Sequence, residues 1–209
     1  MLKFETREQY LNAAIDLMKP LFERNGAKLP KVRVSTGWPS TKALSQKNRR
    51  IGECWDKTAS ADGVFEIFIS PCLDKVAEPG SVLDTLVHEG VHAAVGLECG
   101  HKGAFKKLAT RLGLEGKMTA TSAGEALLAE CKAWAAQLGD YPHAKLDLNK
   151  SPRKKQSTRM IKCECGQCGY TVRTSKKWLD DVGAPHCPKH GEMVVELPDE
   201  GDDDGETED

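Results

Sequence analysis

The chain has 209 residues, of which 39% are hydrophobic, and a formal net charge of −1; this is enough for one sizeable core plus a smaller appendage and excludes wholesale disorder. No apolar run approaches the roughly eighteen residues of a membrane span, and the first twelve residues lack the apolar centre of a signal peptide. We therefore expect a cytoplasmic protein, with nucleoid association left open, whose eight cysteines bind metal rather than form disulfides.

The charges are segregated along the sequence. Residues 196–209 hold nine acidic residues and no basic one, whereas residues 144–177 hold ten Lys or Arg against two acids. A basic segment beside an acidic terminus favours a polyanionic partner over a small metabolite.

The predicted elements alternate between helices and strands. A capping box at Thr6 and Gln9 begins an amphipathic helix over residues 6–23, with a kink or break at Pro20. Segments 31–35, 50–55 and 64–70 have the β-branched and alternating residues of a three-stranded sheet. Helical periodicity returns over residues 82–97, 103–112 and 124–138. These elements predict one α+β domain over residues 1–144.

The remaining residues divide into three segments. Residues 145–160 have no sustained apolar periodicity and predict a flexible basic linker. Residues 161–197 form a cysteine-bearing module that is too small for a core of its own. Residues 198–209 are almost entirely acidic and polar, which predicts a disordered tail.

The most informative segment is LVHEGVHAAVGL, inside the helix predicted over residues 82–97. His88 and His92 are four residues apart, so both imidazoles project from one helix face and can reach a single zinc ion. Glu89 lies beside this pair and can accept a proton from a zinc-activated water and return it to a leaving amine. The alternative is a pair of core histidines satisfied by hydrogen bonds.

A catalytic zinc requires a third protein ligand and one position open to water. Gly96 and Gly100 can end the helix and turn the chain so that His101 returns to the metal. Glu125 and Glu130 on the following helix are competing ligands, but only His101 has the local turn chemistry, and we favour it.

The segment HEGVHAAVGLECGHKGAFKKLATRLG resembles the core of SprT-like (Spartan-type) zinc metallopeptidases. The shared features are the H-E-x-x-H motif, a glycine-containing turn, a Gly-His pair and an aromatic, basic helix. The resemblance spans roughly residues 5–140, and residues 80–112 carry its specific motifs. It implies a zincin-like core, zinc ligands His88, His92 and His101, and Glu89 as general base and acid. Family members cleave proteins that are bound to DNA or crosslinked to it.

A second cluster lies near the C-terminus. Cys165 and Cys168, then Cys187 and His190, form two short knuckles with the separation of a zinc ribbon around a structural zinc ion. Cys163 and His186 lie near enough to replace one of these four. A similar C-terminal ribbon often follows the protease core in SprT-like proteins, so this module adds to the resemblance.

Basic residues of the linker and the ribbon are candidates for nucleic-acid contact. Tyr170 and Trp178 interleave with the basic side chains of the ribbon. In this combination the aromatic rings can stack on nucleobases and the cations can neutralise phosphates. The alternative is that Trp178 packs inside the module and the cations are only solvated. The candidate contacts are Arg153, Lys154, Lys155, Arg173, Lys176 and Lys177.

Together these patterns predict a zinc-dependent endopeptidase with one catalytic and one structural zinc ion, acting on proteins on or near DNA. The main alternative is a non-proteolytic nucleic-acid-binding accessory protein in which both zinc sites are structural. A third is a hydrolase that acts on a non-peptide amide and uses a cysteine ligand, for which Cys54 is the only candidate. No membrane partner is expected. The substrate, the oligomeric state and the choice between DNA and RNA stay open.

Overall fold

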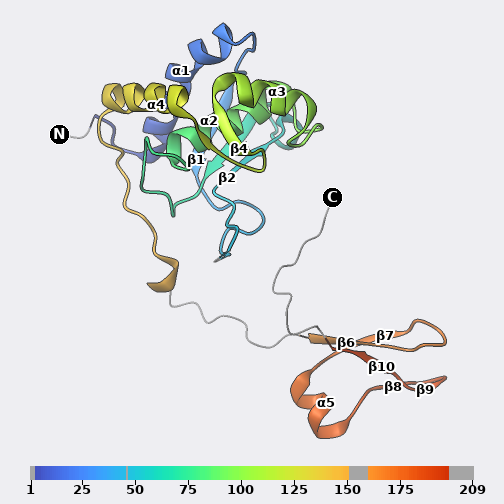
Figure 1. The fold of residues 1–209 in the computed structure, drawn as a ribbon. Helices are drawn as coiled ribbons and strands as arrows, with labels where there is room; N and C mark the ends of the chain where they lie inside the picture. The colour runs from blue at the N-terminus through green and yellow to red at the C-terminus, as the bar shows by residue number, and fades with distance from the viewer. Residues whose placement is uncertain (1–2, 46, 151–159, 198–209) are drawn as a thin grey trace. The chain divides into compact units, whose positions relative to one another are not determined.

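The computed structural model describes residues 3–45, 47–150 and 160–197. The chain divides into two units, Met1–Ser151 and Pro152–Asp209 (Figure 1). Helices and small sheets occur in both, so the predicted α+β class is confirmed.

Unit 1 contains the predicted three-stranded sheet. Its strands are β1 (Val32–Thr36), β2 (Gly52–Trp55) and β3 (Phe65–Ile69), in the order β1-β3-β2. β1 runs parallel to β3, and β2 runs antiparallel to β3 with Gly52 opposite Ile69. β2 is therefore an edge strand, because within the described residues it pairs with β3 alone.

Four helices accompany this sheet: α1 (Arg7–Arg24), α2 (Val82–Val95), α3 (Gly103–Leu112) and α4 (Glu125–Leu138). The predicted capping box at the start of α1 is present, and α1 continues through Pro20 without a break. α2 ends two residues earlier than predicted. Gly96 follows it with φ of +86°, a conformation that stops the helix and that L-residues rarely adopt. Two single 3-10 turns lie at Lys57–Ala59 and Leu148–Lys150.

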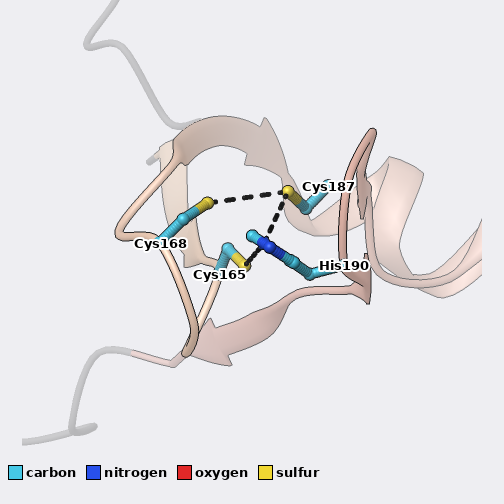
Figure 2. Close-up of side chains that lie close together, drawn as sticks. All are labelled: Cys165, Cys168, Cys187 and His190. Atoms are coloured by element: carbon cyan, nitrogen blue, oxygen red, sulfur yellow. Dashed lines mark hydrogen bonds between the residues drawn. The ribbon is translucent and has the colours of Figure 1, made fainter.

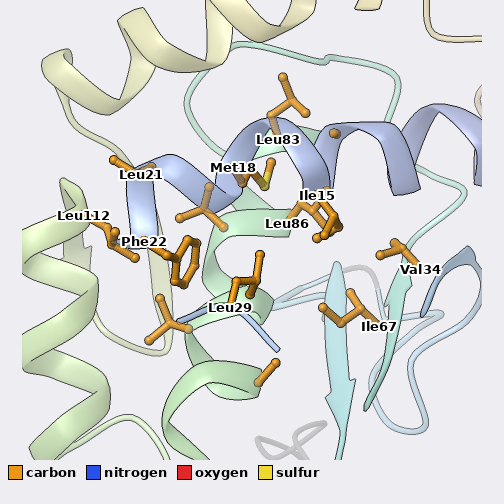
Figure 3. Packing of buried hydrophobic residues seen from close by; sticks show 14 of the residues in the cluster. Ile15, Met18, Leu21, Phe22, Leu29, Val34, Ile67, Leu83, Leu86 and Leu112 are labelled. Carbon is orange, nitrogen blue, oxygen red and sulfur yellow. The ribbon is translucent and has the colours of Figure 1, made fainter. Parts of the chain in front are cut away.

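The core of unit 1 lies where α1, α2 and the sheet meet. Figure 3 shows Met18 and Phe22 of α1 packed among Leu83 and Leu86 of α2, with Ile67 from the sheet close by. A Cβ at Gly90 would lie 3.1 Å from Phe22 Cζ, so the missing side chain allows α2 to approach α1 closely. The helix with the histidine motif is thus fixed on several sides, as its apolar surface predicted.

The sequence did not predict the hairpin between α3 and α4. Its strands are β4 (Leu114–Lys117) and β5 (Ala120–Ala123), paired from Leu114–Ala123 to Lys117–Ala120. Asp84, buried at the start of α2, joins this hairpin to the helix. Its carboxylate accepts the backbone N–H of Ser81 at 2.7 Å and that of Ala123 at 2.9 Å. The Asp84 carboxylate thus links β5 to the start of α2.

Unit 2 is a small antiparallel module. β6 (Met160–Glu164) lies between β10 (Val194–Glu196) and β7 (Thr171–Ser175), and a two-stranded ladder joins β8 (His186–Cys187) to β9 (Gly191–Glu192). A short helix, α5 (Lys176–Val182), follows β7. Among the described residues, the buried cluster of unit 2 consists of Cys163, Cys165, Cys187 and Met193, with Ile161 buried outside it; so small a core provides little apolar packing.

The predicted linker begins against unit 1. The Leu146 backbone N–H donates to the Pro71 carbonyl at 3.0 Å, and Lys145 lies 3.6 Å from Asp74. The rest of the linker (151–159), with Arg153, Lys154 and Lys155, and the acidic tail (198–209) lie outside the described residues. Within the described part of the chain, no helix combines the length and apolarity needed to cross a bilayer.

Candidate metal centres

The structure brings the three predicted histidines of unit 1 together. α2 carries His88 and His92 one turn apart, and the turn after Gly96 returns His101 to them. The Nε2 atom of His101 lies 3.2 Å from His88 Nε2 and 3.2 Å from His92 Nε2. Three imidazoles from two segments therefore point the same ring atom at one centre.

This spacing fits a metal ion. Two ligand nitrogens at about 2.1 Å from a tetrahedral zinc are separated by about 3.4 Å, close to the observed 3.2 Å. The His101 Nε2 atom offers either one lone pair or one hydrogen, so it cannot form good hydrogen bonds to both partners at once. The three rings are therefore a group that could hold a metal ion, and among the described residues no fourth His, Cys, Asp or Glu joins it.

The rings of the two α2 histidines are oriented by different contacts. His88 Nδ1 lies 2.8 Å from the Thr121 hydroxyl on β5. When Nδ1–H donates to that oxygen, Nε2 keeps its lone pair for a metal. His92 is held by packing: the ring of Phe105, which is fully buried, lies 4.3 Å from its ring centroid and within about 5 Å of the other two imidazoles. The sequence analysis did not identify Thr121, because its role depends on the unpredicted hairpin.

Burial keeps the helix histidines neutral. Loss of solvation, with a smaller effect of the neighbouring imidazoles, lowers the pKa of His88 to about 4 and that of His92 to about 3. Neutral imidazole is the form that binds a metal. The site is thus in its ligating state at neutral pH without any further deprotonation.

Glu89 is buried beside the edge strand. A Cβ at Gly52 of β2 would lie 2.5 Å from Glu89 Oε1 and 2.6 Å from Thr85 Cγ2, so only glycine lets β2 lie this close to the carboxylate. Burial raises the pKa of Glu89 to about 8, although the charge of Arg50 favours the ionised form. A cation held by the three histidines would favour ionisation in the same way.

Arg50 is a charged neighbour that the sequence analysis did not identify. Burial is the largest cause that lowers the pKa of His101, and the charge of Arg50 is the second. The same charge also lowers the pKa of His92. Its guanidinium Nη1 lies 2.7 Å from Glu53 Oε1, and Glu53 also accepts the indole N–H of Trp55 at 2.8 Å. Arg50 is thus a positioned cation near the histidine group, and no sequence motif marks it.

The competing ligands of the sequence analysis lie elsewhere. Glu130 forms an ion pair with Arg24 at 2.5 Å, and Glu125 is exposed at the start of α4. Cys54 is buried on β2, where loss of solvation and the charge of Glu89 raise the pKa of its thiol. None of these three joins the histidine group.

Unit 2 gathers the four predicted ribbon residues (Figure 2). Cys165 Sγ lies 3.4 Å from His190 Nδ1, Cys187 Sγ lies 3.7 Å from the same nitrogen, and Cys168 Sγ lies 3.8 Å from Cys187 Sγ. Ligands around a tetrahedral zinc, with Zn–S near 2.3 Å, are about 3.6 to 3.8 Å apart. This group also could hold a metal ion, and here all four positions are supplied by the protein.

The backbone of the first knuckle prepares a thiolate. Amide N–H groups of Gln167 and then Cys168 lower the pKa of Cys165 to about 6, and the thiolate is the form that binds metal. Cys163, one of the open alternatives, is fully buried in the small core, and His186 is exposed on β8. Neither joins the group.

Unit 2 also exposes the predicted nucleic-acid residues that lie in the described part of the chain. Arg173, Lys176 and Lys177 are exposed, and Lys177 Nζ lies 5.0 Å from the centroid of the Trp178 ring. Trp178 is 50% exposed and is not part of the buried cluster. The alternative in which this tryptophan fills the module's core is therefore wrong.

Comparison with known proteins adds no relative: no family model, no curated protein and no solved structure matches the chain. The resemblance to SprT-like metallopeptidases thus stays a prediction from the motif residues.

Proposed function

We propose that the chain is a zinc-dependent endopeptidase with a zincin-like, SprT-like core in unit 1 and a zinc ribbon in unit 2. The observation that carries the proposal is the histidine group. Three Nε2 atoms converge at 3.2 Å, no fourth ligand joins them within the described residues, and a buried carboxylate follows the first histidine in the helix. This combination is what hydrolytic zinc chemistry requires.

His88, His92 and His101 would hold a zinc ion, and a bound zinc would supply a Lewis acid for the scissile carbonyl and for water. Glu89 accepts the proton of the attacking water and passes it to the departing amide nitrogen. Thr121 fixes the orientation of the His88 ring through Nδ1, and Phe105 packs apolar surface against all three imidazoles. The protein thus contributes proton transfer, orientation and a partly desolvated site.

The edge strand offers a place for an extended peptide. β2 pairs with β3 on one side only within the described residues, and its Gly52 lies against Glu89. A peptide that pairs with this edge of β2 would add a strand to the sheet. Such pairing would bring a substrate chain alongside the catalytic carboxylate and selects for extended, unfolded segments.

The ribbon supports action on proteins near nucleic acid. Its exposed tryptophan and three exposed cations are suited to stacking and phosphate contact. Binding through unit 2 would raise the local concentration of DNA-associated substrates around unit 1. The competing function, an accessory protein that only binds nucleic acid, needs the same ribbon but no proton-transfer group in unit 1.

The test is Glu89→Gln in the full chain loaded with zinc. The substrate is a disordered, lysine-rich polypeptide bound to duplex DNA, and cleavage should fall by about 100- to 10,000-fold because the general base is lost. Elemental analysis should still find two zinc ions per chain. Glu98→Gln, which changes an exposed glutamate after α2, is the matched control and should cleave like the wild type. Equal cleavage by Glu89→Gln, or no cleavage by the wild type, would contradict the peptidase and favour the accessory protein.

A further inference from the structure

The outer face of α3 carries a stripe of cations. Lys106, Lys107 and Arg111 are exposed, and at 3.6 residues per turn they lie with Gly103 and Thr110 within about 140° of the helix circumference. The opposite side is buried through Phe105, Leu108, Ala109 and Leu112. We call the exposed set (Gly103, Lys106, Lys107, Thr110 and Arg111) the α3 stripe.

The stripe is open at its Gly103 end, whereas its Arg111 end lies beside the turn after α1, where a Cβ at Gly26 would be 3.8 Å from Arg111 Nη1. Its five residues line one shallow, open depression. A Cβ placed at Gly103 would meet nothing within 4 Å, so no other part of the described chain lies over this end of the depression. A ligand can therefore reach the side chains directly.

The charges of the stripe have no internal partner. Other cations of unit 1, such as Arg24, Arg33 and Arg50, form ion pairs with carboxylates, whereas no ion pair within the described residues involves Lys106, Lys107 or Arg111. Like charges three and four residues apart on a helix repel one another slightly. An external anion would relieve this repulsion.

We propose that the α3 stripe binds the phosphate backbone of nucleic acid, as a second contact surface that belongs to unit 1. Lys106 and Arg111 are five residues apart, about 7.5 Å along the helix axis, and one strand of duplex DNA presents a phosphate about every 3.4 Å. Along the DNA axis the stripe therefore spans about two steps from one phosphate to the next, which allows up to three phosphate contacts. It exposes no aromatic or large apolar side chain that could stack on a base or anchor a peptide, so the contact is to the backbone and independent of sequence.

The stripe begins two residues after His101, so a bound phosphate backbone would lie near the histidine group. Phosphate binding by the α3 stripe extends the proposed function. It rests on that function only for the claim that cleavage takes place beside nucleic acid. Binding by the stripe is a separate property of the surface and can be measured without cleavage.

The experiment measures binding of the full, zinc-loaded chain to a 20-base-pair duplex by fluorescence anisotropy across a range of salt concentrations. The triple variant Lys106→Gln, Lys107→Gln and Arg111→Gln removes three charges from the stripe. The matched control, Lys28→Gln, Lys57→Gln and Lys132→Gln, removes three exposed charges elsewhere in unit 1.

The stripe variant should reduce the slope of log affinity against log salt by about 2 to 3, because each phosphate contact contributes about 0.9. Its affinity at low salt should fall by about 10- to 100-fold, and the control should change the slope by less than about 1. A stripe variant that binds like the control overturns the proposal. The single variant Lys107→Gln, with an expected slope change of about 0.9, guards against misfolding of the triple variant.

Two further measurements distinguish phosphate binding from binding of an acidic protein and from the peptidase activity. Polyglutamate serves as a probe for an acidic protein partner. If the stripe variant loses polyglutamate binding but keeps the wild-type DNA slope, the surface takes acidic polypeptides and the proposal is overturned. Glu89→Gln should keep the wild-type salt slope of DNA binding. A failure of the peptidase assay therefore does not affect the test of the stripe, and a failure of the stripe does not affect the peptidase assay.

Discussion

The two metal-ligand groups differ in what surrounds them. In unit 1 the histidines are attached to a core built by α1, α2 and the sheet, which is complete without them. In unit 2 two of the four core residues, Cys165 and Cys187, are themselves members of the ligand group. A site attached to an independent core can leave one coordination position of a metal ion free for water or substrate. A module that depends on its ligands for cohesion fills all four coordination positions with protein side chains.

This comparison predicts opposite responses to the loss of one ligand. Cys187→Ser should unfold unit 2, because metal binding supplies about 10 to 16 kcal/mol of folding free energy in such modules. His101→Ala should release the metal of unit 1 and leave its fold intact. Elemental analysis should find one zinc ion per chain in each variant, and amide NMR spectra should show which unit loses its dispersed signals.

The controls for this pair lie outside both groups. Cys99→Ser changes a partly exposed thiol, and His143→Ala changes a ring whose Nε2 bonds the Pro71 carbonyl. Both should retain two ions. Collapse of the unit 1 spectrum in His101→Ala would show that its metal is as structural as that of the ribbon.

A smaller change tests how firmly the histidine group is oriented. Thr121→Ala removes the hydroxyl 2.8 Å from His88 Nδ1 and should weaken zinc binding in unit 1 by about 10- to 100-fold. Competition with a chromogenic chelator measures this, with the ribbon as an internal reference that should not change. Thr121→Ser keeps the hydroxyl and should bind zinc like the wild type, as should Thr110→Ala on the exposed face of α3. Equal affinities for Ala and Ser at position 121 would remove the proposed role of the hydrogen bond.

The smallest predicted effect concerns the metal-free chain. Its folded state holds a proton on Glu89 up to about pH 8, where the pKa is raised by burial, while the unfolded chain releases that proton near pH 4.5. Stability should therefore fall as pH rises, by about 2 kcal/mol between pH 6.5 and 8. His88 and His92, with lowered pKa values, act in the opposite direction, because stability falls as pH drops from about 6.5 towards 4.

Urea unfolding followed by circular dichroism at several pH values measures this dependence. Glu89→Gln should flatten the profile above pH 6.5, whereas Glu23→Gln, which changes an exposed glutamate of α1, should reproduce the wild-type profile. A wild-type profile that is already flat between pH 6.5 and 8 would show that Glu89 is not held in its neutral form.

Local signals account for much of what the sequence predicted. The spacing of His88 and His92, the glycines after α2 and the paired knuckles of unit 2 are short-range patterns, and the structure gathers each set of side chains. The capping box of α1 and the number of strands in the first sheet likewise follow from residues that are close together in the sequence.

Contacts between distant segments could not be predicted in the same way. The hairpin of β4 and β5 has few β-branched or alternating apolar residues, and it is held by contacts with distant residues, such as that of Ala123 with Asp84. The closeness of Gly52 and Arg50 to the histidine helix depends on β2 taking the edge beside β3, and strand order is not encoded locally. Thr121 and Arg50 were missed for this reason.

The bond between Asp84 and Ala123 has a consequence for protein engineering. α2 alone, grafted onto another scaffold, would present the imidazoles of positions 88 and 92 but leave the first ring free to rotate about its χ angles. A transplant that keeps the ring orientation must carry residues 81–123 as one piece, because the Asp84 carboxylate and the His88–Thr121 contact both join the helix to the hairpin.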